Sequence, residues 1–90
     1  MVKHLNIRVR GEVQGVSFRH YVTEQAAKLG LTGFVRNEPA GDVYLEAEGE
    51  EAALQKLADW CRHGPAWARV DKIELSSGGL KNFTAFRFIY

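Results

Sequence analysis

The sequence predicts an α+β fold in which two helices cover one face of an antiparallel sheet. Apolar and polar residues alternate in several short segments, two longer segments have apolar residues at helical spacing, and glycines or prolines separate them. The 90 residues are 46% hydrophobic and 26% charged, a composition typical of an ordered chain with a modest core. We therefore expect a single domain over residues 1–90.

The first half of the chain alternates between strand and helix patterns. Residues 5–10 alternate apolar and polar side chains, as a strand with one wet face does. Residues 18–29 place apolar side chains at helical spacing, and the glycine that follows is a natural helix stop. Residues 31–37 and 43–48 then form a predicted hairpin, because the intervening segment EPAG (38–41) has the pattern of a type I turn.

The second half begins with a predicted helix over residues 50–62, whose apolar side chains share one face. Strand patterns follow over residues 69–76, where the alternation is not clean, and over residues 83–90. The predicted order is strand–helix–strand–strand–helix–strand, that of a ferredoxin-like fold with a four-stranded antiparallel sheet and both helices on one face. Its first and third strands are central neighbours, so the loop after the first strand and the end of the second should converge.

Charge and cysteine content exclude several classes of protein. The net charge of +1 gives no electrostatic reason to expect nucleic acid or an anionic membrane as a partner. The single cysteine, Cys61, excludes an internal disulfide and fits a reducing compartment. The first residues lack the apolar run of a signal peptide, and no stretch approaches 18 apolar residues. We therefore expect a cytoplasmic monomer.

The segment GEVQGVSFR (residues 11–19) contains an unusual placement of charge. Arg19 would lie in the first turn of the helix, where the macrodipole disfavours a cation by roughly 0.3–1 kcal/mol. An anion between the guanidinium and free backbone N–H groups would reverse that effect. Gly15 can adopt a positive φ and lets a ligand approach the backbone. From spacing alone, a phosphate site and a solvated arginine after an ordinary turn both stay open.

Two segments together resemble the signature motifs of the acylphosphatases. They are residues 11–19 and GFVRN (33–37), the latter followed by GDV (41–43), and the resemblance extends to chain length and element order. It implies hydrolysis of a small acyl phosphate to a carboxylate and inorganic phosphate, without metal, cofactor or covalent intermediate. It further implies that Arg19 binds the phosphate and Asn37 positions the attacking water. The remaining phosphate ligands would be the backbone amides of Gln14, Gly15, Val16, Ser17 and Phe18.

The implied chemistry suits these residue types. A guanidinium donates two parallel hydrogen bonds to a phosphate, which a lysine cannot do. The asparagine carboxamide can hold water through its oxygen, but it is a weak base, so the proton should leave through a phosphate oxygen of the substrate. The family usually has an acidic residue where this chain has Ala40. Since Pro39 can stiffen the same turn, we expect altered loop stiffness and retained chemistry.

Other residues that could participate have simpler interpretations. We expect Ser17 to cap the helix, His20 to lie on a solvated helix face, and Cys61 to pack in the core. The histidines and Cys61 have no metal-ligand spacing.

The alternative function is a binding module on the same scaffold. One version binds an acyl or carbamoyl phosphate without turnover, and the other binds RNA. Glu46 and Glu48 on the predicted open sheet face make a poor RNA surface.

Overall fold

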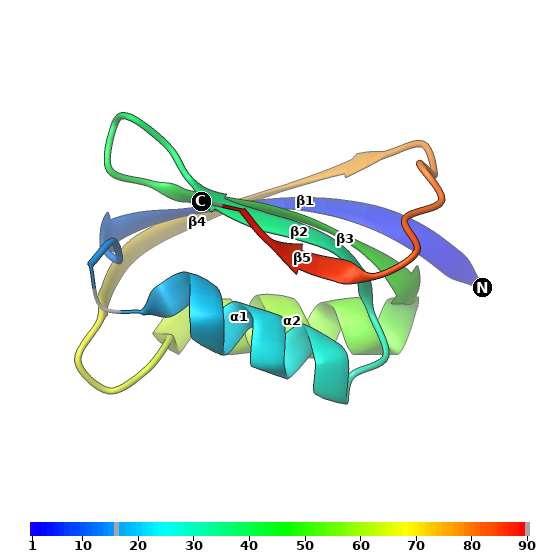
Figure 1. The fold of residues 1–90 in the computed structure, drawn as a ribbon, viewed down its shortest axis with the longest axis horizontal. Helices are drawn as coiled ribbons and strands as arrows, with labels where there is room; N and C mark the ends of the chain where they lie inside the picture. The colour runs from blue at the N-terminus through cyan, green and yellow to red at the C-terminus, as the bar shows by residue number, and fades with distance from the viewer. Residues whose placement is uncertain (16, 90) are drawn as a thin grey trace.

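The computed structural model describes residues 1–15 and 17–89 and is shown in Figure 1. Its elements are β1 (Val2–Glu12), α1 (Phe18–Lys28), β2 (Thr32–Asn37), β3 (Val43–Glu50), α2 (Glu51–His63), β4 (Arg69–Gly78) and β5 (Phe86–Phe88). The strands form one sheet in the order β4-β1-β3-β2-β5, and both helices lie on the same face of it (Figure 1). The predicted ferredoxin-like arrangement, with the first and third strands as neighbours, is confirmed.

The prediction of a four-stranded, purely antiparallel sheet is wrong. β1 pairs antiparallel with both β3 and β4, and β2 pairs antiparallel with β3, but β5 runs parallel to β2 in the register Gly33↔Phe86. The two strand patterns near the end of the chain therefore both form strands, at opposite edges of a five-stranded sheet. This is possible because the β4–β5 connection, formed by residues 79–85, is long enough to cross the helix-free face of the sheet between those edges.

The core lies between the helices and one face of the sheet. Alternate residues of β1 and β3 point into it, which is the period-2 pattern of half-buried strands. The single thiol, Cys61 of α2, is fully buried there, and burial raises its pKa to about 12. The expectation that Cys61 packs in the core is confirmed. The other largest side chains with less than 2% exposure are Phe18, Ile7, Leu45, Leu57, Val9, Val13, Val22, Val35 and Val43.

A buried carboxylate attaches the β4–β5 connection to the helix-free face. The side chain of Glu48 on β3 is only 4% exposed. It accepts hydrogen bonds from the main-chain N–H groups of Lys81 (2.5 Å), Asn82 (2.9 Å) and Phe83 (3.3 Å). Its Oε2 also lies 2.7 Å from Nδ1 of His4 on β1. Glu48 therefore holds the main chain of the connection that leads into β5, and Glu46 on the same strand accepts a hydrogen bond of 2.9 Å from Lys81 Nζ.

Acidification should weaken this attachment. Burial alone would raise the pKa of Glu48, but the main-chain N–H donors and His4 outweigh burial and hold the pKa below its ordinary value. Because the folded-state pKa is depressed, the stabilisation is fully present above the unfolded-state pKa of about 4.3 and is lost as the pH falls through the folded-state pKa. We expect the free energy of unfolding to fall on acidification below that pH, and to fall less steeply in Glu48→Gln.

Urea denaturation between pH 3 and pH 7 measures this dependence. Glu50→Gln is the matched control, because that carboxylate lies on the same strand with its side chain 67% exposed. Equal pH slopes in wild type and Glu48→Gln would contradict the prediction.

Candidate active site

The loop between β1 and α1 is fixed at both of its ends by buried side chains. Val13, directly after β1, and Phe18, the first residue of α1, are each 1% exposed. The Phe18 ring packs on Trp60 of α2 with centroids 5.5 Å apart. Between them, Gly15 has φ 77°, and a Cβ added to it would meet no atom within 4 Å. The main chain at Gly15 is therefore open to a ligand.

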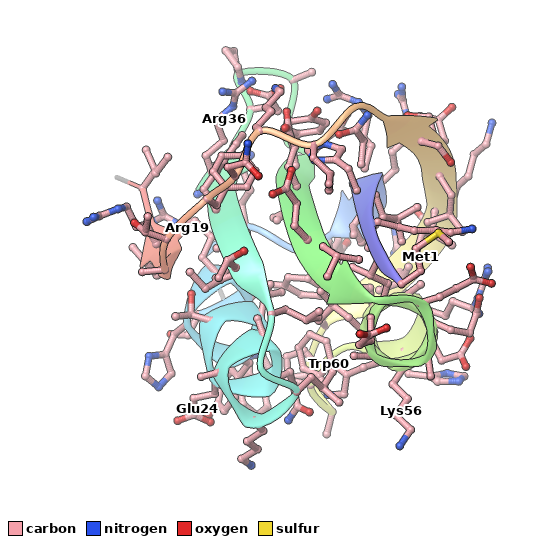
Figure 2. All side chains as sticks on the ribbon, turned by 90° about the vertical axis from the view of Figure 1, so that its right-hand side faces the viewer. Met1, Arg19, Glu24, Arg36, Lys56 and Trp60 are labelled. Carbon is pink, nitrogen blue, oxygen red and sulfur yellow. The ribbon has the colours of Figure 1, made fainter. Side chains whose placement is uncertain are left out.

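Arg19 extends from the first turn of α1 toward β5 (Figure 2). Its Nη1 donates a 2.6 Å hydrogen bond to the carbonyl oxygen of Ile89. Its Cζ lies 4.4 Å from the centroid of the Phe88 ring, within the range of a cation–π interaction. Both contacts favour a cation at a position where the helix dipole disfavours one. The guanidinium is thus held in place by β5 and the residue after it.

Asn37 is the last residue of β2 and pairs with Val43 across the hairpin. The following turn is closed by a 3.0 Å hydrogen bond from the Gly41 N–H group to the Glu38 carbonyl. A second bond of 2.8 Å joins the Glu38 N–H group to the Asp42 carbonyl. The predicted turn over residues 38–41 is therefore present, with Ala40 in it.

One surface pocket brings the two principal candidates together. It has a volume of about 230 Å³ and lies where the β1–α1 loop, the end of β2 and β5 meet. Figure 1 shows this loop and the β2–β3 turn at the same end of the sheet. Arg19 and Asn37 both line the pocket, although 17 residues separate them in sequence. The lining residues are Val13, Gly15, Ser17, Phe18, Arg19, His20, Asn37 and Phe88.

Three of the five residues predicted to bind phosphate through their main chain line this pocket. Gly15, Ser17 and Phe18 line the pocket, whereas Gln14 does not. Val16 lies outside the described residues. The side chain of Gln14 instead donates to two carbonyl groups of the β2–β3 turn. The sequence motif gave no indication of that role.

Ser17 does not cap the helix with its side chain, so that prediction is wrong. It occupies the N-cap position, but in the left-handed conformation (φ 60°, ψ 26°) and without a side-chain cap hydrogen bond. A capping hydroxyl needs an extended backbone to reach the first free N–H groups. The Ser17 carbonyl does accept a hydrogen bond of 3.2 Å from Tyr21 N–H.

His20 is exposed, as expected for a solvated helix face. Its Nε2 lies 3.2 Å from Glu24 Oε2, one turn along the helix. It also lines the pocket, which the helical pattern did not indicate.

Two further features concern metals and membranes. Among residues 1–15 and 17–89, no group of three or more His, Cys, Asp or Glu side chains could hold a metal ion. Neither helix of the described part of the chain has the length and apolar character needed to span a lipid bilayer.

Comparison with known proteins gives a consistent family assignment. The acylphosphatase family model matches residues 5–88. An acylphosphatase from Geobacter sulfurreducens is 49% identical over 69 residues, which cover 77% of this chain and 76% of that protein.

Solved structures agree with the sequence relatives. The crystal structure of an acylphosphatase from Bacillus subtilis superposes with a TM-score of 0.94 at 35% identity, over 100% of both chains. An acylphosphatase structure from Coxiella burnetii gives a TM-score of 0.95 at 35% identity, over 98% of this chain and 93% of that one. With both signature segments inside the matched range, the chain belongs to the acylphosphatase family.

Proposed function

We propose that this protein hydrolyses small acyl phosphates to a carboxylate and inorganic phosphate, with Arg19 binding the phosphoryl group and Asn37 holding the attacking water. The observation that supports these roles is that both residues line one pocket beside the open main chain at Gly15. The membership of the chain in the acylphosphatase family supports the reaction itself.

The reaction makes modest demands on the site. The carboxylate of an acyl phosphate is a good leaving group, so the enzyme has mainly to position the reactants and neutralise charge. A guanidinium has five N–H donors in a rigid fork. Arg19 can therefore keep its bond to the Ile89 carbonyl and still donate to two phosphoryl oxygens. The contacts to β5 restrict the guanidinium before substrate arrives, which lowers the entropic cost of binding.

Asn37 contributes orientation in this mechanism. Its carboxamide oxygen accepts a hydrogen bond from water and directs the water oxygen at phosphorus, opposite the acyl oxygen. The new bond joins water oxygen to phosphorus, the bond between phosphorus and the acyl oxygen breaks, and the carboxylate leaves. The proton of the attacking water passes to a phosphoryl oxygen, because an amide is too weak a base to keep it.

The test is hydrolysis of benzoyl phosphate by the purified chain in the presence of EDTA. We expect turnover by the wild type and competitive inhibition by inorganic phosphate. Asn37→Ala should lower kcat about 100-fold while KM stays within a few-fold, because a misplaced nucleophile costs rate more than binding. Asn6→Ala, which removes a carboxamide from β1 outside the pocket, is the control and should retain activity.

The outcomes separate the competing functions. Calorimetric binding of phosphate without product release would favour a module that binds acyl or carbamoyl phosphate. An RNA-binding role has less support, because the connection bound to Glu48 crosses the sheet face on which such a domain would stack bases. Unchanged kcat in Asn37→Ala would contradict the role proposed for that residue.

We further propose that residues 1–90 form one domain and that the protein is a cytoplasmic monomer without cofactor. The continuous sheet and the family match over residues 5–88 support a single domain. The alternating charges Arg69, Asp71, Lys72 and Glu74 on edge strand β4 support a monomer, because charged edges resist pairing with another sheet. The buried single thiol suits a reducing compartment. Sedimentation velocity of the purified protein measures its mass in solution and so tests whether it is a monomer.

A further inference from the structure

We infer that Gln14 is a positioning residue, whose side chain holds the β2–β3 turn against the β1–α1 loop and thereby sets where Asn37 holds water. This inference rests on the proposed function. It concerns the carboxamide of Gln14, whereas the family motif implies only a role for its backbone.

Both hydrogens of the Gln14 carboxamide are used in the same turn. Nε2 donates to the carbonyl oxygen of Glu38 at 2.7 Å and to that of Asp42 at 2.8 Å. An amide nitrogen has two hydrogens to donate, so this donor capacity is filled. The two carbonyls stand at the two ends of the turn, where they also accept the main-chain N–H groups of Gly41 and Glu38. One side chain from the loop thus closes the base of the turn.

The sheet does not supply this connection directly. The loop follows β1 and Asn37 ends β2, and β3 lies between those two strands. Through the sheet, Asn37 is therefore joined to β1 only by way of β3, the other strand of the turn. The Gln14 bonds cross that gap, and they reach Glu38, the residue next to Asn37 in sequence. Since an error of about 1 Å in a near-attack geometry can cost 100-fold in rate, such a connection bears on kcat.

Ion pairs on the helix-free face hold the same turn less closely. Arg8 Nη1 lies 3.4 Å from a carboxylate oxygen of Glu38 and 3.4 Å from one of Asp42. The Arg8 side chain is 32% exposed, so solvent screens its attraction to both carboxylates. These ion pairs also bind side chains, which can rotate, whereas Gln14 binds the main chain itself. Gln14 is the shorter and more direct constraint.

The contact with two carbonyl oxygens requires a side chain at position 14 that can donate two hydrogen bonds. Glutamate has the same shape as glutamine, but it would direct carboxylate oxygens at two carbonyl oxygens. Methionine has a similar length and no donor, so it removes the bonds without adding repulsion. Glutamine has both the length to reach the two carbonyl oxygens and the two N–H donors to bind them.

The experiment measures benzoyl phosphate hydrolysis by Gln14→Met and Gln14→Glu, alone and combined with Asn37→Ala. We expect Gln14→Met to lower kcat about tenfold, with KM and the inhibition constant of inorganic phosphate within threefold, because the phosphate ligands stay in place. Gln14→Glu should lose more activity at pH 7 and regain part of it on acidification, when the protonated carboxyl supplies one donor. In the Asn37→Ala background, Gln14→Met should change kcat less than twofold, because its effect passes through Asn37.

Gln55→Met is the matched control, since that glutamine donates its amide to Asp59 on the exposed side of α2. It should leave kcat and KM unchanged. Unchanged kcat in Gln14→Met, or the same tenfold loss in the Asn37→Ala background, would overturn the inference. If Gln14→Met does not fold, Gln14→Asn replaces it, because its amide is one methylene too short to reach both carbonyls; wild-type kcat in that variant overturns the inference equally. Absence of turnover in the wild type would instead refute the proposed function.

Discussion

Replacement of Arg19 by glutamine is expected to lower kcat/KM for benzoyl phosphate about 100- to 1,000-fold, the range found when one oxyanion donor is removed. Glutamine has no charge to offset the phosphoryl oxygens and no planar fork to donate to two of them. It would also lose the stacking on Phe88 that holds the guanidinium at 4.4 Å from the ring. Both the charge and the orientation of the donor are therefore removed.

Steady-state kinetics with benzoyl phosphate and calorimetry with inorganic phosphate measure this effect. Arg19→Lys should recover little, because an ammonium keeps the charge but not the fork. Arg87→Gln is the control: this arginine lies on β5 next to Phe88 but does not line the pocket. Wild-type activity in Arg19→Gln would refute the assignment of Arg19 as the phosphate ligand.

Gly33→Ala is expected to lower the free energy of unfolding by about 3–5 kcal/mol, in the range of the most damaging single substitutions. Gly33 has φ 146°, and an added Cβ would collide with the carbonyl oxygen of Glu46 on β3. The residue is also paired on its other side, where its N–H group donates a 2.9 Å hydrogen bond to the Ala85 carbonyl. The main chain cannot move away from β3 without being pressed against the segment that leads into β5, which already lies in hydrogen-bond contact on the other side of β2.

Urea denaturation of Gly33→Ala and Gly79→Ala provides the comparison. A Cβ at Gly79 would meet nothing within 4 Å, so that variant should be close to wild type in stability. A loss of less than 1 kcal/mol in Gly33→Ala would show that the strands separate more easily than their geometry implies.

Much of the fold could be predicted because the pattern of apolar and polar residues in a segment matched the surroundings of that segment in the folded protein. β1 has a core on one side and a helix-free face on the other, so its alternation of apolar and polar residues was clear. The end of the chain was harder. Val70 and Ile73 of β4 are half-buried, Leu75 is exposed, and β5 has only three residues. The parallel pairing of β5 with Gly33 joins residues more than 50 positions apart, which no local pattern reports.

The site, like the fold, contains residues that the sequence could identify and contacts that it could not. Arg19 and Asn37 could be proposed from two motifs, and the structure shows both lining one pocket. The contacts of Gln14 could not, because they depend on where the turn after Asn37 folds back toward the loop. The error at Ser17 has a local cause, since a left-handed residue before a helix gives no signal beyond those of an ordinary cap.

The burial of Cys61 has a consequence for the chemical durability of the protein. Oxidants and alkylating agents react with thiolate, and a thiol with a pKa of about 12 supplies almost none at neutral pH. Since Cys61 lies on the buried face of α2 with no exposed surface, a reagent reaches its sulfur only when that helix leaves the sheet. The rate of thiol modification should therefore follow the frequency of that opening, and the folded enzyme should withstand oxidising conditions that damage proteins with accessible cysteines.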